Sequence, residues 1–493
     1  MSRRLSSATL KLLPVDVARP AYDRQVMQTG VMHLGIGAFH RAHPATYFDE
    51  ALERGDLRWG VMGVSLRSTR VRDELASQDG LYSLVVRDGA DARIRIVGAV
   101  RGVLVAPEDP AKVVRLLAEP QVHLVTLTVT EKGYKLEPTS GDLLREDADI
   151  AADLRELNAP RSALGFIVAG LSARRLAGRK PFTVVSCDNL PHNGRRLRNG
   201  VLALARAHDE SLADWISREG AFPGTMVDRI VPAPTTGDRA QLAQRLGLED
   251  RAGITTEPFR QWVIEERFAG PVPDFAALGV ELTSDVEPWE QAKLRLLNGA
   301  HSAMAYIGGL AGIEFVHDFV ALPEGARFVE ALWEESAPTL SPPPSLDLAD
   351  YQVRLFGRFR NRALPYRLRQ IATDGSQKLP QRLLAPLAAR RAKRLPVAML
   401  GFAVAAWMHW QRGVDDRGES FVVDDPLAGQ TAWRVASCME ASACVQSLLG
   451  LATVFGADIG GDEGLRQMLS LQLERIEKLG ALGALRATLA HLS

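Results

Sequence analysis

The chain of 493 residues has few cysteines, no long apolar run and no excess of charge of either sign. Its three cysteines, Cys187, Cys438 and Cys444, include no Cys-x-x-Cys pair, which argues against a structural zinc site and favours a reducing compartment. No apolar stretch reaches the ~18 residues that a membrane span requires, and the N-terminal segment lacks the continuous apolar region of a secretory signal. The sequence therefore predicts a soluble protein with a cytoplasmic location.

The charge balance also restricts the class of partner. Lysine plus arginine and aspartate plus glutamate each number 59, so the formal net charge is zero. A balanced charge disfavours nucleic acid or an anionic membrane as the main partner. With 46% hydrophobic and 24% charged residues the composition is that of a globular protein, and a chain of this length is expected to form two or three domains.

The order of patterns along the chain predicts an α/β fold followed by a helical region. Strands are expected within 30–37, 58–66, 92–105, 123–130 and 181–189, with helices within 42–55, 110–119 and 162–178. Such alternation is typical of a parallel sheet covered by helices. Beyond residue 285 only helical patterns remain, expected at 288–312, 325–336, 348–372, 381–391, 395–412, 431–455 and 463–491. We therefore expect domains at 1–284 and 285–493.

The turn after the first expected strand is Gly35-Ile36-Gly37-Ala38-Phe39-His40. It holds two of the three glycines of the dinucleotide-binding fingerprint, with His40 in place of the third. Two glycines permit a tight turn and a close approach of backbone N–H groups to a pyrophosphate, although a plain strand-to-helix turn has the same composition. The second expected strand is followed by Arg67 and Arg70 instead of the usual carboxylate. These arginines could face a ribose 2′-phosphate or be solvated.

Three further polar groups stand out near these expected elements. His40 and His43 have a spacing that metal ligands use, but no second cluster of ligands accompanies them, so a helix beside a cofactor is the favoured interpretation. Asn189 follows a strand directly, where ligands bind in α/β sheets, or it forms a simple Asx turn. Asp228 lies among apolar residues at the end of an expected helical region, so it should have a partner such as Arg229.

The segment from 293 to 301, KLRLLNGAH, places polar groups on an apolar helix. At ~100° per residue, Lys293 falls in the middle of an apolar arc, Asn298 and His301 follow along its edge, and Arg295 and Ser302 take the opposite side. The arc consists of Leu296, Leu297, Ala300, Ala303, Met304 and Ile307. A desolvated ammonium group is expensive unless it is paired or loses its proton, although a snorkelling lysine would reach water.

These groups have complementary chemistry. A neutral amine accepts a proton, an asparagine amide stabilises an oxyanion, and a histidine orients a hydroxyl group. Together they would allow an alcohol to be oxidised without a metal.

Six segments, in this order and spacing, resemble the mannitol dehydrogenase family of polyol-specific long-chain dehydrogenases. They are GIGAFHRAH (35–43), TLTVTEKGY (126–134), SCDNLPHNG (186–194), FPGTMVDRIVP (222–232), EPFRQWVIE (257–265) and KLRLLNGAHSA (293–303). The resemblance spans nearly the whole chain. It implies a Rossmann-type N-terminal domain, a mostly α-helical C-terminal domain that binds substrate and carries the catalytic residues, and zinc-independent, nicotinamide-dependent hydride transfer.

The same resemblance implies roles for individual residues. Lys293 takes the place of the catalytic lysine, Asn189 and Asn298 those of the oxyanion-hole asparagines, His301 that of the active-site histidine and Glu290 that of the acid that guides proton exchange. The expected cofactor-binding residues are Gly35, Gly37, Phe39, Arg67 and Asp228. NAD(H) is the expected cofactor, with NADP(H) as the alternative that the two arginines keep open.

Within the family, the segment DGSQKLPQRLL (374–384) looks like that of the D-mannonate oxidoreductases, or fructuronate reductases. Mannitol 2-dehydrogenases carry an arginine at the position of Gln370. The expected substrate is therefore a sugar acid, whose carboxylate Lys378 and Arg382 could bind. Mannitol 2-dehydrogenase activity on D-mannitol and D-fructose is the alternative. A dinucleotide-binding sensor without activity would not need Lys293, and a metal-dependent alcohol dehydrogenase would need cysteine and histidine clusters that the sequence lacks.

Overall fold

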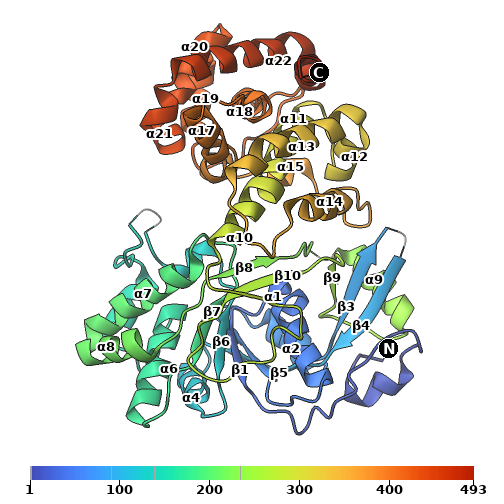
Figure 1. Cartoon of the computed structure of the whole chain (residues 1–493). Coiled ribbons are helices and arrows are strands. Elements are labelled where there is room, and N and C mark those ends of the chain that lie inside the picture. Colours follow the sequence, from blue (N-terminus) through green and yellow to red (C-terminus); the bar gives the residue numbers. More distant parts are fainter. Residues whose placement is uncertain (1–2, 90, 138–139, 234, 493) are drawn as a thin grey trace. The chain divides into compact units, whose positions relative to one another are not determined.

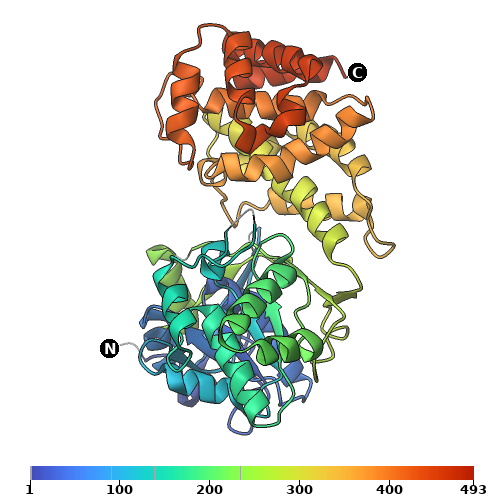
Figure 2. The same ribbon diagram turned by 90° about the vertical axis from the view of Figure 1, so that its left-hand side faces the viewer.

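The computed structural model describes residues 3–89, 91–137, 140–233 and 235–492. Its contacts divide the chain into two compact units, Met1–Glu287 and Pro288–Ser493, which are described separately (Figure 1). The first unit combines strands and helices. In the second unit, every regular element within the described ranges is helical, as Figure 2 shows in yellow to red.

A parallel sheet forms the centre of the first unit. Its five strands have the order β5-β2-β1-β6-β7, and all neighbouring pairs are parallel. The strands are β1 (Val31–Leu34), β2 (Val61–Ser65), β5 (Val100–Val105), β6 (Leu124–Leu127) and β7 (Thr183–Ser186). Counted along the chain within this sheet, the order is 3-2-1-4-5, which is that of a Rossmann fold. The predicted α/β class with a Rossmann-type first part is confirmed.

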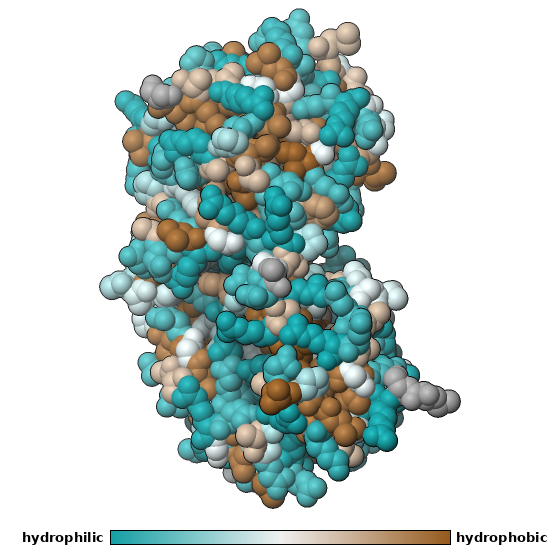
Figure 3. All heavy atoms as spheres, turned by 90° about the vertical axis from the view of Figure 1, so that its right-hand side faces the viewer, coloured by the Kyte–Doolittle hydropathy of each residue, from teal (hydrophilic) through white to brown (hydrophobic). Residues whose placement is uncertain are grey.

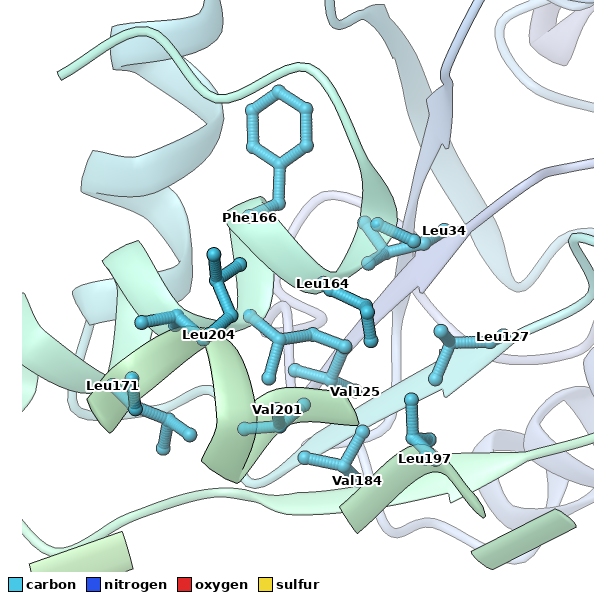
Figure 4. Packing of buried hydrophobic residues seen from close by; sticks show 14 of the residues in the cluster. Leu34, Val125, Leu127, Leu164, Phe166, Leu171, Val184, Leu197, Val201 and Leu204 are labelled. Carbon is cyan, nitrogen blue, oxygen red and sulfur yellow. The ribbon is translucent and has the colours of Figure 1, made fainter. Parts of the chain in front are cut away.

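Helices cover both faces of this sheet, because its strands are apolar on both sides. On one face, side chains of β1, β6 and β7 pack against α4 (Pro110–Ala118), α6 (Ala163–Leu176) and α7 (Asn193–His208). Figure 4 shows side chains from β1, β6, β7, α6 and α7 meeting in this core. The other face packs against α2 (Pro44–Glu53) and α3 (Arg70–Ala76). This burial fixes the positions at which the strands end.

Two small sheets complete the first unit and correct two predictions. Their orders are β4-β3-β9 and β11-β10-β8. Their strands are β3 (Tyr82–Asp88), β4 (Asp91–Val97), β8 (Thr225–Asp228), β9 (Ile254–Thr256), β10 (Gln261–Glu265) and β11 (Glu281–Thr283). The segment 92–105 reads as two strands that pair with each other, and this prediction is wrong, because β4 pairs with β3 whereas β5 joins the parallel sheet. The expected helical region ending near Asp228 is strand β8, antiparallel to β10.

The remaining helices of the first unit connect these elements. They are η1 (Ser7–Leu12), α1 (Ala38–Ala42), η2 (Glu131–Tyr134), α5 (Ala148–Arg155), α8 (Glu210–Glu219) and α9 (Thr236–Leu246). Figure 3 shows one face of the molecule, on which hydrophobic residues are interspersed among hydrophilic ones.

The helices of the second unit begin with a nearly continuous helix from Glu287 to Leu310, formed by α10, η3 and α11. The others are α12 (Val316–Ala321), α13 (Pro323–Ser336), η4 (Ala337–Thr339), α14 (Leu348–Phe359), α15 (Leu368–Ile371), α16 (Gly375–Leu379), η5 (Pro380–Leu384), α17 (Ala385–Ala392), α18 (Ala398–Trp410), α19 (Ala428–Ala436), α20 (Ala441–Leu449), α21 (Ala452–Gly460) and α22 (Glu463–Ala490). Of the described helices none is by itself long and apolar enough to cross a membrane; the bent pair α20 and α21 meets that criterion only jointly, by length and composition.

Two long helices expected in this unit are interrupted. The pattern over 348–372 divides into α14 and α15, because Pro365 lies between them and supplies no backbone N–H to a helix. The pattern over 431–455 divides into α19, α20 and α21, and Glu440 has extended backbone angles before α20. Periodicity alone therefore overestimates helix length where a break is set by one or two residues.

Candidate active site

The helix that opens the second unit contains a π-helical turn. It runs through α10 (Glu287–Ala292), the π segment η3 (Lys293–Asn298) and α11 (Gly299–Leu310). Lys293 is the first residue of this segment and Asn298 the last. Single π turns inside α-helices are found most often at functional sites. The sequence predicts a regular α-helix here, and this prediction is wrong for the segment that begins with Lys293 and ends with Asn298, two of the predicted catalytic residues.

The polar side chains assigned to chemistry on this helix are buried in the second unit. Glu290, Lys293, Asn298 and His301 are between 6% and 8% exposed. The six apolar side chains predicted to share their face are buried as expected, at 3% exposure or less. The four polar side chains therefore form a strip along one helix and are removed from water among apolar neighbours.

Arg295 and Ser302, opposite the apolar arc, are expected on a solvent-like side of the helix, but this side does not face solvent. Ser302 is 1% exposed, and Arg295 is half-buried with its guanidinium donating to the carbonyl oxygen of Thr339 at 2.7 Å. The reason is that helices α12, α13, α15, α18 and α22 all contact α11. A helix enclosed on every side has no polar face to be read from its sequence.

The amide nitrogen of Asn298 is the most informative atom of this set. It is buried and has no hydrogen-bond partner among the described residues. An unsatisfied buried donor costs about 1–3 kcal/mol, and one reason for a native protein to retain it is an acceptor that a bound ligand supplies. A substrate oxygen that becomes negatively charged would be such an acceptor.

Aromatic side chains surround His301. Its ring lies 4.9 Å from the ring of Phe359 and 5.4 Å from that of Tyr366, measured between centroids. These contacts restrict the orientation of the imidazole. Sequence reasoning missed both aromatic residues, because they come from chain segments about 60 residues away and carry no local signal.

A second π segment, η5, packs against the first. A Cβ atom on Gly299 would lie 2.9 Å from the carbonyl oxygen of Arg382, so only glycine permits this approach. The guanidinium of Arg382 donates to Ser302 Oγ at 3.0 Å, and no carboxylate of the described chain forms an ion pair with it. Burial lowers the pKa of Arg382. The Arg382 guanidinium is therefore held beside α11, and its other N–H groups are available to donate to an anion.

Lys378 is engaged differently from the expectation. Its ammonium group donates to the carbonyl oxygen of Thr373 at 2.5 Å and to that of Ile371 at 3.4 Å. Burial, with Arg382 as a further contribution, lowers the pKa of Lys378. Lys378 thus closes the turn before α16, and its role as a substrate ligand remains a prediction.

In the first unit, the glycine turn after β1 has the expected geometry. Gly35 has φ +88°, and a Cβ there would lie 2.4 Å from the carbonyl oxygen of Thr128. A Cβ on Gly37 would meet only one backbone oxygen, that of Gly35 at 3.7 Å, so the backbone of Gly37 faces open space. The turn leads into α1, which has five residues, and the half-buried Phe39 of α1 stacks on the ring of His43. A ligand could approach this backbone closely.

Two buried histidines, His33 and His40, lie next to the glycine turn. His33 lies between the hydroxyl groups of Thr126 and Thr128, at 2.7 and 2.8 Å, and Thr128 Oγ1 donates to the carbonyl oxygen of Gly35. Thr128 therefore accepts from Nε2–H of His33, which is neutral because burial lowers its pKa to about 3. The ring of His40 stacks on that of His33 with centroids 3.5 Å apart. His33 is thus a hydrogen-bonding group of the turn, whereas His40 packs on it by ring stacking.

The remaining predicted residues of the first unit lie at strand ends. Asn189 is exposed just after β7, and Asp228 ends β8 at 5% exposure. Asn193 connects the segment after β7 with the start of β8, since its Nδ2 donates to the carbonyl oxygen of Asp188 at 3.1 Å and to that of Thr225 at 2.9 Å. The guanidinium of Arg229 donates to the carbonyl oxygens of Ala42 and Glu257.

The loop that follows β2 is exposed and contains arginines where a carboxylate usually lies, as the sequence predicts. Residues 67–70 are exposed, including Arg67 and Arg70. Ser65 closes the loop by donating to the carbonyl oxygen of Ser68 at 2.6 Å. The carboxylate that usually follows this strand in dinucleotide-binding folds is absent from the loop.

Family models match both units. The model of the mannitol dehydrogenase Rossmann domain matches residues 29–276, and that of the mannitol dehydrogenase C-terminal domain matches residues 285–477. The chain belongs to the mannitol dehydrogenase family. It is therefore an oxidoreductase of that family, and the resemblance seen in the sequence is confirmed.

Relatives within the mannitol dehydrogenase family have more than one substrate in their names. The chain is 41% identical to a D-mannonate oxidoreductase of Escherichia coli over 90% of this chain and 92% of that one. It is 38% identical to a mannitol 2-dehydrogenase of Phaeosphaeria nodorum over 99% of this chain and 87% of that one. The structure of Pseudomonas fluorescens mannitol 2-dehydrogenase, a ternary complex with NAD and D-mannitol, has a TM-score of 0.86 and 36% identity, covering 99% of each chain.

The close approach of the two π segments is tested by Gly299→Ala. The added methyl group would press on the carbonyl oxygen of Arg382, and overpacking of this kind costs ~1–3 kcal/mol. The calorimetric unfolding midpoint should fall by about 2–10 °C. Gly357→Ala in α14 is the matched control, because no atom lies within 4 Å of its Cβ position, and it should leave the midpoint unchanged or raise it. Equal midpoints for the two variants would contradict the packing described.

Proposed function

We propose that the chain is a fructuronate reductase that transfers a hydride between NAD(H) and the D-mannonate/D-fructuronate pair. The observation that carries the catalytic part is the buried, unpartnered amide nitrogen of Asn298 on the same π turn as the buried Lys293. A binding protein gains nothing from retaining these desolvated groups, whereas catalysis of hydride transfer at a carbinol carbon requires a base and an oxyanion donor.

The residues of the first unit fit a dinucleotide. NAD supplies the nicotinamide ring that accepts or donates the hydride. In sheets of this order, dinucleotides bind beyond the carboxyl ends of the strands at the point where the order reverses, here between β1 and β6. The open backbone of Gly37 is at this edge, directly after β1. Gly35, Gly37, Phe39, Arg67 and Asp228 are the residues proposed to hold NAD, and Arg67 leaves NADP as the alternative cofactor.

The polar groups of the opening helix divide the proton chemistry. Hydride leaves the carbinol carbon as its hydroxyl loses a proton, so a base is needed near neutral pH. A free lysine has a pKa of ~10.4 and is almost wholly protonated there, but burial disfavours the charged ammonium form. Lys293 is the proposed base, and Glu290, about one turn earlier, passes the proton onward. Asn298 and Asn189 donate to the oxygen as it becomes anionic, and His301 orients it.

The preference for a sugar acid is supported by Arg382. A partly buried guanidinium with a single hydrogen bond to Ser302 retains several donors for a carboxylate. Arginine binds carboxylates in a planar two-pronged geometry, which a neutral polyol does not offer. D-mannitol and D-fructose are the second candidate pair, favoured by the similar identity to a mannitol 2-dehydrogenase.

The role of the lysine is tested by Lys293→Ala. The variant should fold and bind NADH normally but lose kcat by at least ~10²-fold, the scale of general base catalysis. We expect the wild-type oxidation rate to show an ionisation between neutral and alkaline pH, which the variant should lose. An added primary amine should restore part of the rate.

Lys393→Ala provides the control for this variant, because Lys393 is an exposed lysine of the same unit just after α17. It should keep the wild-type kcat and pH profile. A Lys293→Ala enzyme with near-wild-type kcat and an unchanged profile would show that the lysine is only a packing residue and would refute the mechanism.

The substrate assignment is tested by Arg382→Met. Loss of a hydrogen bond to a charged group costs ~1.5–3 kcal/mol, so kcat/KM for D-fructuronate should fall about 10–100-fold more than that for D-fructose. Lys378→Met is the comparison, because the Lys378 ammonium is bonded to backbone carbonyls. Similar losses for the two substrates would assign the carboxylate to Arg382 alone, whereas a larger loss for D-fructuronate would show that Lys378 binds it as well. Equal losses for the two substrates in Arg382→Met would move mannitol and fructose to first place.

A further inference from the structure

Thr130 is strained at the edge of the sheet where ligands bind. It follows β6 with φ 64° and ψ 166°, a region of backbone space that is accessible essentially to glycine alone. A β-branched residue is especially disfavoured there. Such strain persists only where the surrounding contacts enforce it, and it is concentrated at functional sites.

The carboxylate of Asp188 supplies the enforcing contacts. One of its oxygens accepts from the backbone N–H of Thr130 at 2.8 Å, and the other accepts from that of Val129 at 3.2 Å. The phenol of Tyr134 donates to the same carboxylate at 3.0 Å and also bonds to Ser186 Oγ. Asp188 is 8% exposed, and these donors offset part of the cost of burying its charge. Burial still raises the pKa of the Asp188 carboxyl above its usual value.

The strained loop borders two of the proposed site elements. Just before it, the carbonyl oxygen of Thr128 lies against Gly35, in the turn after β1. Asp188 directly precedes the exposed Asn189, and its own carbonyl oxygen is fixed by Asn193. One carboxylate therefore connects the ends of β6 and β7, next to the point between β1 and β6 where the strand order reverses.

We propose that Asp188 is a positioning residue that holds Thr130 in its strained conformation and so keeps the ends of β6 and β7 in the shape that binds the dinucleotide. This inference rests on the proposed function. A preformed loop pays its ordering cost during folding and not on binding, which is the physical meaning of pre-organisation. Neither Asp188 nor Thr130 touches the reacting atoms in this account; both act through the backbone and through Asn189.

A double-variant experiment separates this role from simple structural support. Asp188→Asn keeps the shape but replaces one acceptor oxygen by an amide donor. It should raise the Kd for NADH and lower kcat/KM, each by at least tenfold. Thr130→Gly alone is the reference for the double variant, since glycine adopts this conformation without strain. In the double variant, glycine makes the carboxylate less necessary, so at least half of the loss on a logarithmic scale should be recovered.

Thr130→Ala combined with Asp188→Asn is the matched control. It removes the hydroxyl but keeps the strain, so it should recover nothing. Recovery by alanine as well as glycine, or no recovery by glycine, would overturn the proposal, as would an Asp188→Asn enzyme with wild-type constants. If Asp188→Asn fails to fold, the glycine double variant is expected to fold, and its failure would also overturn the proposal. A wild-type chain without NADH binding or turnover would instead refute the proposed function itself.

Discussion

The burial of polar groups along the helix from Glu287 to Leu310 is the constraint on which the rest of the second unit depends. Lys293 and Asn298 delimit a π turn, and both are nearly inaccessible in an environment built from apolar helices. Removing a charge and an amide from water is unfavourable unless partners replace the water. The contact of Gly299, at the start of α11, with η5 and the bond from Arg382 to Ser302 hold this helix against η5 just after the π turn. The arrangement is rigid where a reaction would need rigidity.

The first unit also contains an energetically unfavourable feature, which lies in its backbone conformation. The glycine turn after β1 lies against Thr128. Two residues after Thr128, Thr130 has backbone angles that are strongly unfavourable for threonine. A buried histidine and a buried aspartate, His33 and Asp188, provide the hydrogen bonds that hold these segments. Both units thus contain destabilising features, a strained backbone or buried polar groups, at or next to the residues for which the family resemblance implies binding of cofactor or substrate. Such features are common at active sites.

The sequence predicted those features that depend on local pattern. Apolar runs such as Val31–Leu34 are strands because both of their faces are buried, and the arc around Lys293 is buried because its period matches a helix. Features that depend on distant partners were not predictable. The segment 92–105 is divided between two sheets, and Ser302 is buried by helices far away in sequence.

The same limit applies within the candidate site. A π turn arises from a shift in backbone hydrogen bonding that packing decides, and the letters KLRLLN do not differ from those of an α-helix. Thr130 reads as the continuation of a strand, because threonine favours extended structure, and only the carboxylate of Asp188 reveals why it departs from it. The bonds from Lys378 to backbone carbonyls depend on how the turn before α16 closes.

The most direct test of the central claim is to measure kcat and thermal stability together for Asn298→Leu, which is nearly isosteric. If the buried amide is retained for an oxyanion, kcat should fall by at least ~10²-fold, the effect of losing one oxyanion donor. The unfolding midpoint should stay the same or rise, because an unsatisfied buried donor has been replaced by an apolar group of similar shape. A midpoint lowered by several degrees with near-wild-type kcat would show that Asn298 serves the fold and not the reaction.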